Sequence, residues 1–325
     1  MKLPKSWTVV FAALLLGCGD GASPAGPLEP IDPIEARIQQ LFPEGEEPPF
    51  GNLNRDQIRR MLQVPPEEDE PFYMLNLIKH YDVAQYPDGR ESDLSGAAAD
   101  GIYGSLVLPI LAEIGARPVF VSSVELNLID GDQAGWTQIA IVRYPSRAAF
   151  FGMLERDDFQ DASIHKVAGV EKTIVMVAQR EVDEFPASFY EVDLEALPTP
   201  PTPDDPPIAI CHILDYHDIA QYADGRETTL TGREAMDLYS QGRFEQDVIG
   251  MGVRPGLWLE IEGELLGRGS QFEEFRVNNF PNRETFFQIA NAESFAEAGG
   301  EHRLAAIKET YTQLTVPLLN EDGYR

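Results

Sequence analysis

The sequence predicts an α+β protein built from two similar domains, each with the element order strand, helix, strand, strand, helix, strand. The first observation is an internal repeat: DVAQYPDGRE at residues 82–91 returns as DIAQYADGRE at residues 218–227, with eight of ten positions identical. Matches continue on both sides at nearly the same spacing, among them Tyr103 with Tyr239. The repeat spans a whole domain, because its period far exceeds the roughly 20 to 50 residues of a solenoid unit.

The second observation is the apolar pattern of the first copy, which switches between strand and helix periods. Ser95 can cap the first helix, and Gly115 can end it. The expected strands are residues 72–80, 117–129, 136–144 and 172–179, and the expected helices are residues 95–115 and 146–170. This order is the split βαβ arrangement called ferredoxin-like, in which both helices cover one face of an antiparallel sheet.

The third observation is that apolar residues point to both faces of the expected strands. Met74 and Leu75, which are successive residues of the first strand, illustrate this. Such a strand must be covered on both faces. Helices cover one face only, so we expect the sheets of the two copies to pack face to face as a pseudo-dimer within one chain.

The second copy repeats the order of elements. Thr231 and Glu234 form a capping box that predicts the start of its first helix. Its expected strands are residues 208–214, 257–266, 272–277 and 310–318, and its second helix is expected at residues 282–290.

The first 17 residues have the form of an export signal, with Lys2 and Lys5 before an apolar run too short to span a bilayer. The sequence LLGC that ends at Cys18 is similar to the lipobox of bacterial lipoproteins. That similarity implies that Cys18 is lipidated and anchors the chain to a lipid bilayer. We therefore expect a protein of the bacterial cell envelope, on the periplasmic face or at the outer membrane.

Composition divides the chain further. The stretch LPTPPTPDDPP can form neither helix nor sheet and is typical of a stiff linker, while NRDQIRRMLQ before the first copy has helical spacing, with Asn54 and Gln57 placed like a capping box. The expected parts are a lipoprotein signal peptide (1–17), a flexible tether (18–35), a helical N-terminal extension (36–70), the first domain (71–194), a proline-rich linker (195–207) and the second domain (208–325).

The formal net charge is −29, from 54 acidic and 25 basic side chains. Such an acidic surface excludes nucleic acid as a partner and repels anionic headgroups, so membrane attachment should come from the lipid. Apart from Cys18 the chain has only Cys211, so no internal disulfide is expected. Cys211 aligns with Leu75 of the first copy, which indicates a buried apolar position.

The motifs MLNLIKH, YPDGRE and IVRYPSRAAF, with Tyr103 and His165 in the first copy, resemble the dimeric α/β-barrel family catalogued as domain of unknown function 1330. The resemblance covers most of residues 72–179 and, more loosely, 208–318. It implies a ferredoxin-like fold paired into a barrel, and no settled activity. Relatives by fold include cofactor-free monooxygenases, haem enzymes and binding proteins, so the fold does not choose a reaction.

The repeated loop is the leading candidate for a site, because it gathers carboxylates, a phenol and a guanidinium in one segment. The expected ligand-binding residues are Asn76, Asp82, Tyr86, Asp88, Arg90 and Tyr103 in the first copy and His212, Asp218, Tyr222, Asp224, Arg226 and Tyr239 in the second. The alternative is structural: the Asp-Gly pair forms a turn, Arg90 pairs with a carboxylate, and Tyr86 covers the sheet edge.

These residues favour the binding of a small organic molecule in a cavity between each sheet and its helix and loop. The first alternative is a cofactor-independent oxygenase or isomerase in which Asp82 or His165 is the base. The second is a non-catalytic interaction module. We expect no cofactor.

Two differences between the copies raise the question of a metal, because His212 replaces Asn76 and Asp215 replaces Lys79 within the sequence CHILDYHD. Strand alternation places Cys211 and Asp215 on the face opposite His212, so these side chains should not converge. We therefore expect no metal site.

Overall fold

The structure is a computed structural model that describes residues 32–43, 45, 48–131, 133–181, 186–244, 248–293 and 300–324. The expected signal peptide, Cys18 and residues 19–31 of the expected tether lie outside the described residues. Within the described part, no helix is long and apolar enough to cross a membrane.

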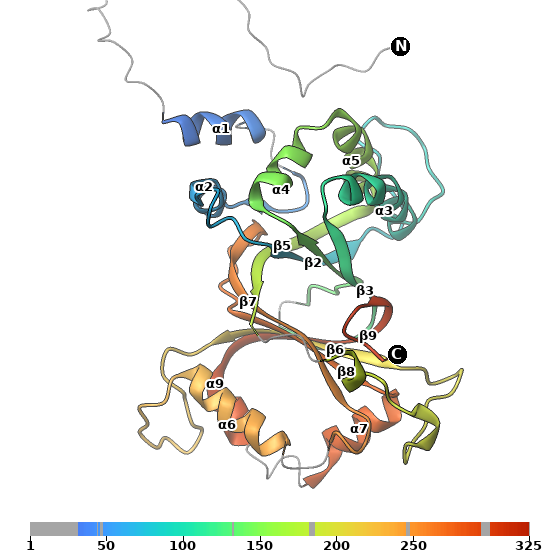
Figure 1. The fold of residues 1–325 in the computed structure, drawn as a ribbon, viewed down its shortest axis with the longest axis vertical. Coiled ribbons are helices and arrows are strands. Elements are labelled where there is room, and N and C mark those ends of the chain that lie inside the picture. Colours follow the sequence, from blue (N-terminus) through green and yellow to red (C-terminus); the bar gives the residue numbers. More distant parts are fainter. Residues whose placement is uncertain are drawn as a thin grey trace, which may run out of the picture.

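Eight antiparallel strands form a closed barrel (Figure 1). Around the barrel the order is β7-β5-β2-β4-β3-β9-β6-β8, and a pairing between β7 and β8 completes the ring. The strands are β2 (Phe72–His80), β3 (Arg117–Asp130), β4 (Gln138–Tyr144), β5 (Val170–Arg180), β6 (Ile208–Tyr216), β7 (Arg254–Gly267), β8 (Glu274–Phe280) and β9 (Ile307–Asn320). The expected α+β class, with the sheets of both halves joined in one barrel, is confirmed.

Each half of the chain supplies four neighbouring strands, and two pairings join the halves. Strand β3 pairs with β9 from Phe120 opposite Asn320 to Asp130 opposite Tyr311, and β5 pairs with β7. Pairing within each half has the same register, since Asn76 lies opposite Ala140 and the equivalent His212 lies opposite Arg276. Closure leaves no exposed edge among these eight strands.

The helices lie outside the barrel, with those of the first half on one side and those of the second half on the other (Figure 1). The first half carries α3 (Gly96–Glu113), α4 (Arg147–Leu154) and α5 (Asp157–Gly169), and the second carries α6 (Gly232–Phe244), α7 (Arg283–Asn291) and α9 (Gly300–Ala306). Before them come α1 (Pro33–Leu41), the short strand β1 (Asn52–Leu53), which pairs with β7, and α2 (Arg55–Gln63). Two short 3-10 turns, η1 (Ala187–Phe189) and η2 (Leu194–Ala196), lie between β5 and β6.

Side chains at the helix starts satisfy backbone groups that would otherwise lack partners. Ser95 accepts a hydrogen bond from the Ala98 amide, which begins α3 as expected. The expected capping box forms at Thr231, whose hydroxyl accepts from the Glu234 amide while the Glu234 carboxylate accepts from the Thr231 amide. The region expected as helix at residues 146–170 is two helices, because α4 ends at Leu154 and α5 begins at Asp157.

The two faces of each strand enter different cores. In β2, Leu75 and Leu77 point into the barrel, whereas Met74 and Ile78 pack beneath the helices of the first half. The interior also takes Cys211 from β6, and six large aromatic side chains fill much of the remaining space. These aromatic residues are Tyr73, Phe120, Trp136, Phe272, Phe275 and Tyr311. The barrel is therefore a packed core shared by both halves.

A reversed ion pair explains one difference between the halves. Lys79 of β2 pairs with Glu171 of β5 at 3.5 Å, and at the equivalent position Asp215 of β6 pairs with Lys308 of β9 at 2.9 Å. The exchange of Lys79 for Asp215 is matched by an opposite exchange on the neighbouring strand. Asp215 therefore contributes an ion pair between β6 and β9 in the second half.

Truncation inside the barrel should destabilise the whole chain. We expect Leu75→Ala to lower the free energy of unfolding by about 2 to 5 kcal/mol, because Leu75 is fully buried and its loss leaves a cavity. Urea denaturation followed by far-UV circular dichroism measures the change. Leu318→Ala is the control, since Leu318 is 73% exposed and should change stability by about 0.5 kcal/mol at most. Equal effects of the two substitutions would contradict the packed interior.

Candidate functional site

The repeated loop is fastened to a helix of its own half in the same way twice. The Tyr86 hydroxyl lies 2.7 Å from Nδ1 of His165 on α5, and the Tyr222 hydroxyl lies 2.6 Å from Nδ1 of His302 on α9. Each pair of rings also meets nearly edge to face. Both tyrosines are buried. The hydrogen bonds therefore hold each loop against the helix that precedes the last strand of its half.

The arginine of the loop covers the same tyrosine from outside. The Arg90 guanidinium lies 4.2 Å from the centre of the Tyr86 ring, and Asp88 pairs with Arg90 at 2.8 Å. Arg90 holds the pKa of the Asp88 carboxyl below its usual range, chiefly through their side-chain hydrogen bond. Gly89, with φ of 75°, supplies the left-handed turn between them.

The second loop repeats this arrangement with one addition. Arg226 lies 3.7 Å from the centre of the Tyr222 ring and pairs with Asp224 at 3.4 Å. It also reaches Glu301 on α9 at 2.9 Å. The structure thus brings together the tyrosine, aspartate and arginine expected in each loop. In both loops the arginine lies over the tyrosine ring and pairs with the aspartate.

The first acid of each loop stands apart from these contacts. Asp82 and Asp218 are exposed. His165, the other candidate base, is partly buried and is engaged by Tyr86. Burial, and to a lesser degree the charge of Arg90, lowers the pKa of His165. The loop contacts therefore match the structural alternative, and a catalytic base at Asp82 or His165 stays a prediction.

The two remaining expected residues of the first half are Asn76 on β2 and Tyr103 on α3. The Asn76 amide donates to the Met74 carbonyl at 3.1 Å and to the Ala140 carbonyl at 3.3 Å. Tyr103 contacts Lys166, whose Nζ lies 5.3 Å from the ring centre. Burial raises the pKa of the Tyr103 phenol. Both side chains are thus engaged by protein groups.

A buried polar cluster near them was missed in the sequence. His80 at the end of β2 lies 3.2 Å from Asp100 of α3 through Nε2 and 2.8 Å from the Thr137 hydroxyl through Nδ1. Lys166 lies close by, and Asp100 opposes the lowering of its pKa by burial. The available signal was Asp100 itself, an acid inside a helix of small and apolar residues. In the second half Tyr216 and Met236 replace His80 and Asp100.

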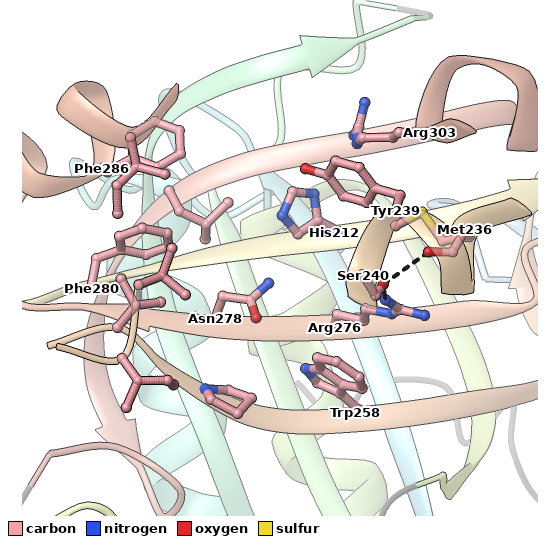
Figure 2. Close-up of a pocket in the computed structure, with 16 residues that line it drawn as sticks. His212, Met236, Tyr239, Ser240, Trp258, Arg276, Asn278, Phe280, Phe286 and Arg303 are labelled. Carbon is pink, nitrogen blue, oxygen red and sulfur yellow. Dashed lines mark hydrogen bonds between the residues drawn. The ribbon is translucent and has the colours of Figure 1, made fainter. Parts of the chain in front are cut away.

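The second half contains a cavity of about 150 Å³ between the outer face of its strands and its helices. Strands β6, β7 and β8 supply its floor, and α6, α7 and α9 supply side chains around it (Figure 2). Two expected binding residues, His212 of β6 and Tyr239 of α6, line the cavity. The expected Asp218, Tyr222, Asp224 and Arg226 are not among its lining residues.

Alternation along the strands explains which residues reach the cavity. Ile210 and His212 of β6 point outward into it, while Cys211 between them points into the barrel. Burial raises the pKa of the Cys211 thiol to about 12, so this group is an inert apolar residue. In the part of the chain that the structure describes, no three His, Cys, Asp or Glu side chains converge as metal ligands.

One arginine of the cavity is held tightly by the protein. Arg276 of β8 donates to the Ser240 hydroxyl at 2.9 Å, and its guanidinium lies 4.5 Å from the centre of the Trp258 ring. It also pairs with Glu274, which is fully buried. Arg276 is therefore neutralised within the fold, and sequence reasoning missed it because its partners come from three different elements.

The second arginine has a different environment. Arg303 of α9 is partly buried, and it forms no ion pair with any residue that the structure describes. Burial lowers the pKa of its guanidinium, while the nearby Tyr239 and Tyr216 phenols oppose that shift. An arginine stays protonated in proteins, so a positive charge stands at this wall of the cavity.

The opposite part of the cavity is apolar. Phe280 and Phe286 meet edge to face with their ring centres 5.3 Å apart, and Ile289 and Val253 add aliphatic surface. Figure 2 shows the two phenylalanines toward one end and Tyr239, Arg303 and Arg276 toward the other. An apolar surface with a few convergent polar groups is the usual composition of a small-molecule site.

No protein-family model matches the sequence, and no curated protein matches it. Among solved structures, the methylated RPA0582 protein is 30% identical over 39% of this chain and 90% of that chain, with a TM-score of 0.35. RPA0582 is a protein of unknown function from Rhodopseudomonas palustris. This similarity assigns no activity to the chain.

Two other solved structures cover more of the chain at lower identity. An anthrone oxidase-like protein is 12% identical over 79% of this chain and 98% of its own, with a TM-score of 0.39. A mutant of chlorite dismutase from Candidatus Nitrospira defluvii is 10% identical over 77% of this chain and 93% of its own, with a TM-score of 0.40. Such similarities assign no activity to this chain.

The contact between His165 and Tyr86 predicts a pH effect on stability. The folded pKa of His165 is lowered, so the unfolded chain binds the proton more readily than the folded one. The contribution of His165 is therefore complete above its unfolded pKa of about 6.5 and is lost as the pH falls below it. We expect the difference in melting temperature between the wild type and His165→Gln to shrink from pH 8 to pH 5. A difference that stays constant or grows on acidification would refute this.

Proposed function

We propose that the cavity of the second half binds a small organic molecule, and that the protein presents this site from a membrane of the bacterial cell envelope. The observation that supports binding is a concave surface lined by two phenylalanines together with Arg303, Tyr239 and His212. The chain would then be two fused ferredoxin-like domains of which the second carries the site.

The order of strands supports the proposed pair of domains. Within each half, the strands lie side by side in the order fourth, first, third, second: β5-β2-β4-β3 and β9-β6-β8-β7. That order, with the helices on one face, is the ferredoxin-like arrangement. Pairing of β3 with β9 and of β5 with β7 then makes one barrel from two domains.

The size of the cavity limits what it can take. An apolar cavity of about 150 Å³ can hold a molecule the size of benzene. The space of about 150 Å³ beside Phe280 and Phe286 therefore suits one ring or a short branched chain. The polar groups at the other end would orient a substituent on that ring.

Differences between the halves support a site in the second. Beneath the first-half helices, Phe72, Tyr144 and Phe150 pack together, with ring centres 5.2 to 6.3 Å apart. In the second half Ile208 stands at the position of Phe72, which removes one aromatic ring from the equivalent layer. The smaller side chain of Ile208 thus leaves space beneath the helices of the second half, where Phe72 fills the equivalent position in the first half.

Attachment to the membrane is the part of the proposal that rests on the sequence around Cys18. In a bacterial host, we expect wild-type protein in the membrane fraction and Cys18→Ala protein in the soluble fraction. Immunoblotting of fractionated cells measures the distribution. Incorporation of radiolabelled palmitate into the wild type alone is the chemical check, and equal partition of the two forms would contradict the anchor.

Filling the cavity should abolish binding. The probe is 4-fluorobenzyl alcohol, a neutral single-ring molecule, observed by fluorine NMR during titration of the full chain. We expect Ile210→Phe to weaken binding by about tenfold or more, because the added ring occupies the floor of the cavity. Met74→Phe is the matched control, since Met74 holds the equivalent position in the first half. Absence of binding to the wild type, or equal loss in both variants, would refute a site in the second half.

A further inference from the structure

We propose that the ligand of the second-half cavity is an aromatic monocarboxylate, and that Arg303 is the counter-ion of its carboxylate. This inference rests on the proposed function, because it names the chemical class of molecule that the cavity takes. Four observations carry it: the charge of the lining, the partners of its arginines, the comparison with the first half, and the position of the aromatic wall.

The charge of the lining is opposite to that of the protein. The described residues that line the cavity include Arg276, Arg303 and His212, and none of them is Asp or Glu. The whole chain, by contrast, has 54 acidic and 25 basic side chains. A concave, largely apolar wall strengthens the field of the charges within it. The described lining of the cavity therefore carries net positive charge on an acidic protein.

Among the residues that the structure describes, Arg276 has a counter-ion and Arg303 has none. Arg276 has Glu274 as its counter-ion and Ser240 as its acceptor. Arg303 forms no ion pair within the described part of the chain. A partly buried guanidinium without an anion is costly, and a bound carboxylate would supply both the charge and two acceptor oxygens. Because Arg303 carries a single positive charge, we expect the ligand to carry a single carboxylate.

The first half shows what the second has lost. There, Lys166 stands at the position of Arg303 and has the Asp100 carboxylate near it. In the second half Met236 replaces Asp100, and the cation is retained as an arginine. Arginine presents a planar fork that fits a carboxylate, whereas lysine presents a single point charge. The second half therefore lacks the carboxylate that Asp100 supplies in the first half, and its Arg303 guanidinium is suited to binding the carboxylate of a ligand.

The geometry assigns the two ends of the ligand. Phe280 and Phe286 form the apolar end, and Arg303 with Tyr239 forms the other (Figure 2). An aromatic ring packs well against aromatic side chains in offset or edge-to-face contact. The ring of the ligand then lies against the phenylalanines, and its carboxylate faces Arg303 and the Tyr239 hydroxyl.

The test compares 4-fluorobenzoate with 4-fluorobenzyl alcohol, which has nearly the same shape and no charge. Both are titrated into the full chain at pH 7.5 and observed by fluorine NMR. We expect the carboxylate to bind about 10- to 100-fold more tightly, the range of a hydrogen bond to a charged group. Acetate, which has the charge without the ring, should compete only weakly.

Variants then assign the charge to Arg303. Arg303→Gln should weaken binding of 4-fluorobenzoate by about tenfold or more and change binding of the alcohol little. Lys166→Gln, the equivalent change in the first half, should affect neither probe. Met236→Asp restores the acid of the first half beside Arg303 and should also abolish selectivity for the carboxylate. Thermal unfolding of each variant checks that the fold is retained.

The outcomes separate this inference from the proposed function. If the alcohol binds the wild type as tightly as the carboxylate does, the inference is overturned and the binding function stands. The same conclusion follows if neither Arg303→Gln nor Met236→Asp changes the affinity for the carboxylate. If neither probe binds the wild type, both are overturned. A selectivity that disappears in both variants and persists in Lys166→Gln supports the inference.

Discussion

Barrel closure is the constraint on which the rest of this structure depends. The pairings of β3 with β9 and of β5 with β7 join the two halves into one ring, and the alternation of strand side chains then decides what each residue faces. Leu75 and Cys211 enter a common interior because of that closure. The interior is filled by large side chains from both halves, so each half depends on the other for its core. Space for a ligand is found on the outer face, beneath the helices.

On the outer face, the two halves have diverged within one architecture. The first half packs Phe72, Tyr144 and Phe150 there and has the buried pair of His80 and Asp100. In the second half, β8 carries Arg276 and Asn278. The equivalent positions on β4 of the first half are Ala140 and Val142. These exchanges convert an apolar layer into a cavity with a polar end. The proposed carboxylate ligand would neutralise the positive charge of Arg303.

The repeated loops contribute by holding their helices in place. In each half a tyrosine bonds a histidine on the helix before the last strand, and an arginine covers the tyrosine ring. His302 and Arg303 are neighbours on α9, so the second loop fixes the short helix that carries the charge. The strongest repeat in the sequence thus supports the cavity from a distance, and its own residues do not line it.

The sequence by itself determined the order of the barrel strands, their bounds to within about three residues and the capping residues Ser95 and Thr231, because these depend on local periodicity and on side chains within one turn. Two of the residues expected from the repeat, His212 and Tyr239, line the cavity, and their role in binding stays a prediction. Only the tertiary structure decided that Arg276 pairs with Glu274 and that Arg303 forms no ion pair within the described part of the chain. Burial and the distances between α9, β8 and α6 set those partners, and neither can be read from the spacing of residues in one segment.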